Sequence, residues 1–93
     1  MIKFSRKNWD YYDPYSILDL DELDESTIYP TEDLLQFTNL QSGTIVDLGY
    51  YQKIWIVFII KNEDWENPLE KIEFQKLLDA LFTIEGLLSK YDT

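Results

Sequence analysis

The chain contains neither cysteine nor histidine, and among its 93 residues it has a single arginine, Arg6, and three isolated glycines. Without cysteine there is no disulfide and no thiolate metal site, which fits a reducing compartment. Without histidine the commonest general base and the commonest metal ligand are both missing. Isolated glycines do not build a phosphate-binding loop. We therefore expect no enzyme, no metal site and no cofactor, because neither a Ser-His-Asp nor a Cys-His arrangement is available.

Long apolar runs are also missing. The longest, Ile54 to Ile60, has seven residues, far below the ~20 that span a bilayer. The first ten residues contain no apolar segment typical of a secretory signal. We expect one small cytoplasmic domain, residues 1–93. Its formal net charge of −10 predicts that it binds neither nucleic acid nor a membrane directly, since both are polyanions.

Basic residues are missing from one long stretch, Asn8 to Gln52. Its 45 residues include ten carboxylates and no lysine or arginine, whereas the remaining residues carry eight acidic and eight basic side chains. The whole formal charge therefore lies in this stretch, together with Trp9 and six of the seven tyrosines. Carboxylates without cations repel one another, and a basic partner relieves that repulsion. Tyrosine and tryptophan are frequent anchors of interfaces.

These features predict a partner-binding surface in the first part of the stretch. Two other interpretations remain open: a solvated, solubilising loop, and aromatic side chains that fix the N-terminal segment to a sheet. A calcium loop is not expected from Asp19 to Pro30, because its sixth position is Asp24, where glycine is needed. The candidate residues are Trp9, Asp10, Tyr11, Tyr12, Asp13, Tyr15, Asp19, Asp21, Glu22, Asp24 and Glu25.

Regular patterns begin in the second half of the chain. Residues 44–61 hold two β-branched and aromatic runs, and the four residues Tyr50 to Lys53 predict an antiparallel hairpin between them. Both faces of Ile54–Ile60 are apolar, which favours a central strand that is covered on both sides, or one that is covered on one side with a face left for a partner. From Phe74 onward apolar residues recur at spacings of three and four, which predicts an amphipathic helix over residues 76–90.

Residues 68–75 fit two structures. Asn67-Pro68-Leu69-Glu70 is a plausible helix start. The alternation of Ile72 and Phe74 with charged neighbours instead indicates a short strand over residues 70–75. We favour the strand, because a two-stranded hairpin alone makes a poor sheet.

The N-terminal half gives weaker signals. Thr31 before two acidic residues predicts the N-cap of a short helix, and Ile2 with Phe4 suggests an edge strand. The first thirty or so residues of the basic-free stretch, which begins at Asn8, are expected to lie outside the sheet and helix. The fold class is therefore α+β: a small antiparallel sheet packed against a C-terminal helix, with an irregular acidic N-terminal half.

From Gly43 to Lys90 the chain predicts a strand, a tight turn, a strand, a turn with Trp, Asn and Pro, a short strand and a helix. In this order it resembles the small acidic immunity proteins of bacterial contact-dependent growth-inhibition and polymorphic toxin systems. The resemblance covers about half the chain and implies a non-catalytic cytoplasmic protein that neutralises a basic toxin domain, often a nuclease. It transfers no binding residue. The residues that carry it are Ile45–Gly49, Trp55–Lys61, Asp64–Leu69 and Leu77–Leu88.

Two other functions use the same chemistry. A nucleic-acid mimic, such as a phage inhibitor of a DNA- or RNA-binding enzyme, presents carboxylates in place of phosphates. A protein-binding regulator shares the acidic and aromatic surface. Irregular spacing of the acids favours the immunity protein over the mimic.

Overall fold

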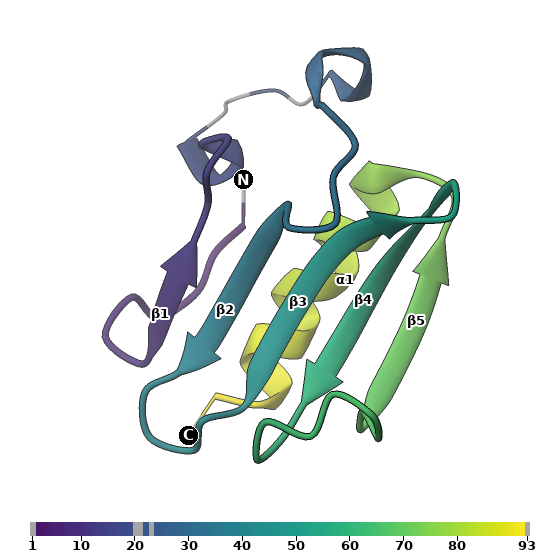
Figure 1. Ribbon diagram of the computed structural model, residues 1–93. Coiled ribbons are helices and arrows are strands. Elements are labelled where there is room, and N and C mark those ends of the chain that lie inside the picture. The colour runs from purple at the N-terminus through teal and green to yellow at the C-terminus, as the bar shows by residue number, and fades with distance from the viewer. Residues whose placement is uncertain (1, 20–21, 23, 93) are drawn as a thin grey trace.

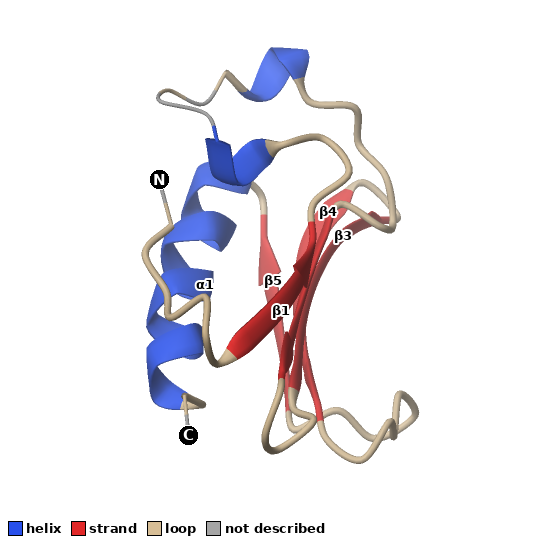
Figure 2. Ribbon diagram, turned by 90° about the vertical axis from the view of Figure 1, so that its left-hand side faces the viewer, coloured by secondary structure: helices blue, strands red, loops and turns tan. Residues whose placement is uncertain are grey.

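The computed structural model describes residues 2–19, 22 and 24–92. The described residues form a five-stranded antiparallel sheet in the order β1-β2-β3-β4-β5, with one α-helix along one face (Figures 1 and 2). The expected α+β class is therefore confirmed. The elements are β1 Trp9–Tyr12, the 3-10 helices η1 Ile17–Asp19 and η2 Glu25–Thr27, β2 Leu35–Asn39, β3 Ile45–Tyr51, β4 Ile54–Ile60, β5 Glu70–Phe74 and α1 Leu77–Lys90.

The hairpin expected over residues 44–61 is formed by β3 and β4. Its turn is shorter than the four residues expected, because only Gln52 and Lys53 lie between the strands. Their φ angles of 50° and 68° are those of a two-residue turn that matches the twist of a hairpin. β4 has a strand on each side, which confirms the interior position predicted from its two apolar faces.

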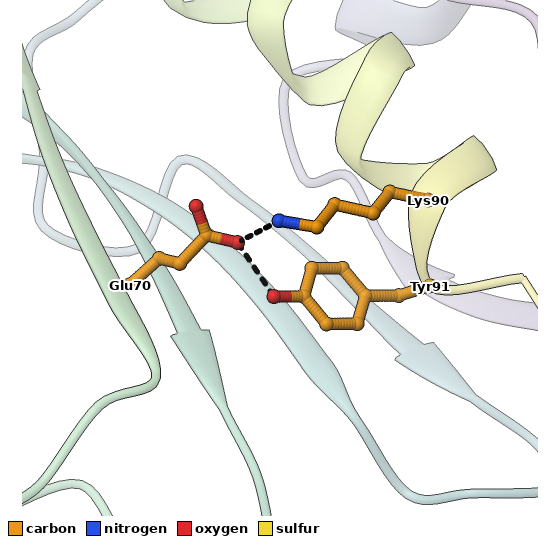
Figure 3. Close-up of polar contacts among 3 residues, drawn as sticks. All are labelled: Glu70, Lys90 and Tyr91. Carbon is orange, nitrogen blue, oxygen red and sulfur yellow. Dashed lines mark hydrogen bonds and ion pairs between the residues drawn. The ribbon is translucent and has the colours of Figure 1, made fainter.

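Residues 70–74 form a strand and not the beginning of the helix. β5 pairs with β4, and α1 begins three residues after β5 ends, at Leu77. At the other end of α1, the Glu70 carboxylate accepts hydrogen bonds from Lys90 Nζ (3.1 Å) and Tyr91 OH (2.5 Å), as Figure 3 shows. These two bonds fasten the end of the helix to the first residue of β5.

Two expectations for the N-terminal half are wrong. Thr31 does not begin a helix: the chain from Thr31 to Leu34 is irregular and leads into β2, which pairs with β1 and β3. Pairing on both sides outweighs the local preference of one capping residue. Ile2 and Phe4 form no strand, because they pack against the core from the helix side, where Figure 2 shows the N-terminal segment.

The hydrophobic core lies between the sheet and α1 and includes part of the N-terminal half. Ile2, Trp9, Ile17 and Leu18 are each exposed by 7% or less and belong to the same cluster as the apolar side of the helix. The expectation that the first thirty or so residues of the basic-free stretch lie outside the scaffold is therefore wrong. Their apolar residues are few, but those few reach the core.

Candidate partner-binding surface

The predicted binding residues gather around one end of the sheet. β1 ends at Tyr12 and β2 begins at Leu35, and the segment between them passes the end of the sheet at which α1 begins (Figure 1). Within this segment the structure describes residues 13–19, 22 and 24–34. Of the predicted residues, Asp21 lies outside the described part of the chain.

Trp9 is not on the surface. Its side chain is 1% exposed, and its pairing with Asn39 places it on the helix side of the sheet. The indole Nε1 is buried without a hydrogen-bond partner among the described residues. Trp9 therefore has the other role considered for the aromatics: it fixes the N-terminal segment to the sheet.

Three of the predicted acids make hydrogen bonds that shape the backbone. Asp13 accepts from the backbone N–H groups of Ile17 (2.8 Å) and Leu18 (2.9 Å). These bonds hold η1, from which both apolar side chains enter the core. Since the N–H groups at a helix start have no partner within the helix, a carboxylate placed there replaces the missing bond.

Asp24 and Glu25 act at the next two helix starts. Asp24 caps η2 by accepting from the hydroxyl (2.7 Å) and the N–H (3.0 Å) of Ser26, and these bonds lower the pKa of Asp24. Glu25 accepts from the backbone N–H of Leu77, the first residue of α1. Lys76, the N-cap residue of α1, makes no side-chain capping bond, so the Glu25 carboxylate caps the helix instead.

Other carboxylates of the segment are exposed and unbonded. Within the described chain, their side chains have neither a hydrogen bond nor an ion pair, and the one ion pair there joins Lys90 to Glu70. Asp10 is also exposed, but its carboxylate accepts from the N–H of Tyr11 (3.0 Å). We call the unbonded group the free carboxylates: Asp19, Glu22, Glu32 and Asp33.

Four tyrosines of the acidic half are exposed. Tyr11 (45%) lies against the Phe4 ring and the Arg6 guanidinium. Tyr12 (56%), Tyr15 (43%) and Tyr29 (71%) have no aromatic or cationic neighbour in the described chain. With the free carboxylates, these three define what we call the acidic face: Tyr12, Tyr15, Asp19, Glu22, Tyr29, Glu32 and Asp33.

Sequence reasoning missed the last three of these residues. Glu32 and Asp33 were assigned to the first turn of a helix that does not exist, and Tyr29 was not singled out. A usable signal was present: from Tyr29 to Asp33 the sequence has no aliphatic residue that could bury this segment in the core.

One carboxylate of the basic-free stretch is buried in the sheet. Asp47 on β3 is 4% exposed and lies on the face opposite α1, where Gln36 Nε2 donates to it (3.1 Å). Burial raises the pKa of Asp47 to about 6, and nearby Asp33 adds to the rise, whereas the bonds from Gln36 and Tyr51 oppose it. The Tyr51 hydroxyl lies 3.4 Å from the carboxylate.

The free carboxylates at Glu32 and Asp33 are held near Asp47 by backbone contacts. Tyr50 donates its N–H to the carbonyl of Thr31 (2.9 Å), and the Tyr51 hydroxyl donates to the carbonyl of Glu32 (3.1 Å). This carbonyl comes so near β3 that a Cβ at Gly49 would lie 2.1 Å from it. Glycine at this position therefore lets the chain at Glu32 pass close to β3 on the face opposite α1.

Among the described residues, no group of three carboxylates is placed to hold a metal ion, and no helix is long and apolar enough to cross a membrane. A hollow of about 90 Å³ lies between Ile2 and the outer side of α1 at Leu78 and Phe82. It is small beside the ~300–1,000 Å³ of usual ligand pockets, and Asp47 does not line it.

No protein-family model, no curated protein and no solved structure matches the chain. Its function is therefore inferred from the chemistry of its surface.

Proposed function

We propose that this chain is an immunity protein, which binds and neutralises a basic protein toxin, such as a nuclease domain, through its acidic face. One observation carries this function: Asp19, Glu22, Glu32 and Asp33 are exposed without a cationic neighbour in the described chain. Asp13, Asp24 and Glu25 accept hydrogen bonds from backbone N–H groups of the fold. The free carboxylates make no such bonds within the described chain, and their mutual repulsion opposes folding.

The acidic face suits rapid capture of a cationic protein. Opposite charge raises association rates toward ~10⁸–10⁹ M⁻¹s⁻¹ at low salt. Tyr12, Tyr15 and Tyr29 offer large amphipathic area beside the acids, and such residues slow dissociation once they are buried in an interface. An immunity protein acts where its toxin would act, so we expect this chain in the cytoplasm.

The test compares two variants with the same change of charge. The first neutralises the acidic face: Asp19→Asn, Glu22→Gln, Glu32→Gln and Asp33→Asn. The control neutralises four exposed acids elsewhere: Glu63→Gln, Asp64→Asn, Glu66→Gln and Asp79→Asn. The partner tested first is the product of the gene next to this one, expressed as a toxin in growing cells.

We expect wild type and the control to restore growth and the acidic-face variant to lose at least tenfold in association rate at low salt. Equal association rates for both variants, with equal salt dependence, would remove the acidic face from the mechanism. A wild-type protein that instead competes with DNA for several unrelated DNA-binding proteins would be a nucleic-acid mimic and not an immunity protein.

A further inference from the structure

The two edges of the sheet differ in their backbone hydrogen bonds. An edge strand leaves N–H and C=O groups unpaired, which invites another strand. On β1 the N–H groups that β2 does not use are occupied: Trp9 donates to the carbonyl of Ser5 (3.2 Å) and Tyr11 to the Asp10 carboxylate (3.0 Å). The chain therefore blocks its own β1 edge.

The N–H groups at the β5 edge are not blocked in this way. The residues that flank the two-residue turn between β3 and β4, Tyr51 and Ile54, form a hydrogen-bonded pair. Ile54 and every second residue after it therefore direct their backbone N–H and C=O groups toward β3. Val57 therefore turns its groups toward β5, where it lies opposite Ile72. The neighbours of Ile72, Lys71 and Glu73, consequently direct N–H and C=O away from the sheet. Figure 1 shows no described segment beyond β5.

The side chains along this edge are complementary to themselves. Lys71 and Glu73 are exposed, lie on the face opposite α1, and belong to no ion pair within the described chain. A two-fold axis at Ile72 brings Lys71 of one copy opposite Glu73 of the other. The same axis makes these residues a hydrogen-bonded pair, because both direct their backbone groups outward.

We propose that β5 pairs antiparallel, about Ile72, with β5 of a second copy of this chain, so that the dimer has one continuous sheet. Each Lys71 then exchanges backbone hydrogen bonds with the Glu73 opposite, and their charges attract across the strands. On the helix side the two Ile72 side chains meet. Ile72 and Phe74 are only partly buried in the monomer, so pairing covers apolar surface that is otherwise exposed to solvent.

The charge distribution permits this dimer despite the net charge of each copy. The excess of ten carboxylates lies between Asn8 and Gln52, and the charges of the rest of the chain, to which β5 belongs, sum to zero. β1 and β5 are separated by four strand spacings, or about 19 Å, against a Debye length of ~8 Å at physiological salt. A single strand pair is a small interface, so we expect a dissociation constant on the order of 100 μM.

Charge reversal tests this pairing without disturbing one copy. On β4, Lys71 lies opposite Phe58 and Glu73 opposite Ile56, so a change of charge on β5 faces no charged residue on β4. Lys71→Glu alone places two glutamates opposite each other in the dimer, and Glu73→Lys alone places two lysines. The double variant Lys71→Glu with Glu73→Lys restores the attraction with the charges exchanged.

Sedimentation equilibrium at about 0.15 M salt, with protein from roughly 10 μM to 2 mM, measures the association. We expect each single variant to raise the dissociation constant about tenfold and the double variant to return it to the wild-type value. Hydrogen exchange should slow at the Lys71 and Glu73 amides as the concentration rises. Phe82→Ser, which removes an exposed ring from α1 (79% exposed), should change neither measurement.

Three results would overturn the inference. Wild type could remain monomeric throughout the concentration range. The single variants could dimerise as wild type does while both amides exchange freely, or Phe82→Ser could abolish association, which would place the contact on the helix. Circular dichroism of each variant at the lowest concentration separates loss of pairing from loss of fold.

Discussion

The N-terminal part of the molecule, residues 2–34, and the part from β3 to α1 are held together by different contacts. β3, β4 and β5 are joined by continuous backbone ladders, and α1 lies on them with a full apolar side. Among its described residues the N-terminal part has one short strand and two single-turn helices, and carboxylates accept from N–H groups at both helix starts. A high density of acids therefore serves two purposes, local structure and free charge, which composition alone does not separate.

The largest expected effect tests whether the N-terminal part belongs to the folding unit. Trp9→Ala should lower the free energy of unfolding by about 3–5 kcal/mol, which is most of the ~5–10 kcal/mol available to so small a domain. The reason is that Trp9 is 1% exposed in the core beneath β1 and β2. Urea unfolding measures the change.

Tyr12→Ala is the matched control, because Tyr12 is in the same strand but 56% exposed. Its expected change is below about 1 kcal/mol. Trp9→Phe should be milder than Trp9→Ala, since phenylalanine fills most of the site and removes the unpartnered indole N–H. If Trp9→Ala were as mild as Tyr12→Ala, the N-terminal part would be an appendage and not part of the core.

The part from β3 to α1 was predictable because its patterns are local. Alternating apolar residues with a short turn between them define a hairpin, and the helix period after Phe74 has few competitors. β2 was missed although Leu35-Gln36-Phe37-Thr38 alternates apolar and polar residues, because this run is short. Thr31 followed by acids is also a sound helix start until β1 and β3 pair on either side. Long-range pairing decided this segment.

The candidate site was predictable only in part. The sequence located the charge, and it identified the tyrosines at residues 11, 12 and 15. It did not separate Asp13, Asp24 and Glu25, which bind backbone N–H groups, from Asp19 and Glu22, which do not. Capping by Glu25 joins residues 52 positions apart in sequence, and no local pattern contains that information.

The second effect concerns Asp47 on β3, the one buried acid among the described residues. Burial raises the pKa of Asp47 from 3.8 to about 6, so the folded protein holds this proton more tightly than the unfolded chain. The contribution of Asp47 to stability should therefore fall as pH rises from about 4 to about 6 and stay lower above that. Asp47→Asn should raise the free energy of unfolding by up to about 3 kcal/mol near pH 8 and leave it unchanged near pH 4.

Urea unfolding of both proteins at the two pH values measures this difference. Glu63→Gln removes an exposed carboxylate and should change stability by less than about 0.5 kcal/mol at either pH. An Asn variant that is less stable than wild type near pH 8 would mean that ionised Asp47 supports the sheet through Gln36 and Tyr51.

The smallest effect joins the two parts of the molecule at the start of α1. Glu25→Ala should destabilise the protein by about 1 kcal/mol, because the N–H of Leu77 loses its acceptor and the helix start loses a negative charge. Glu22→Ala removes the same charge from an exposed residue without a hydrogen bond in the described chain, and it should be neutral within about 0.5 kcal/mol. The two midpoints of urea unfolding, measured at low and high salt, separate the cap from the charge. Equal midpoints would mean that Glu25 belongs with the free carboxylates, and the acidic face would then extend to the start of the helix.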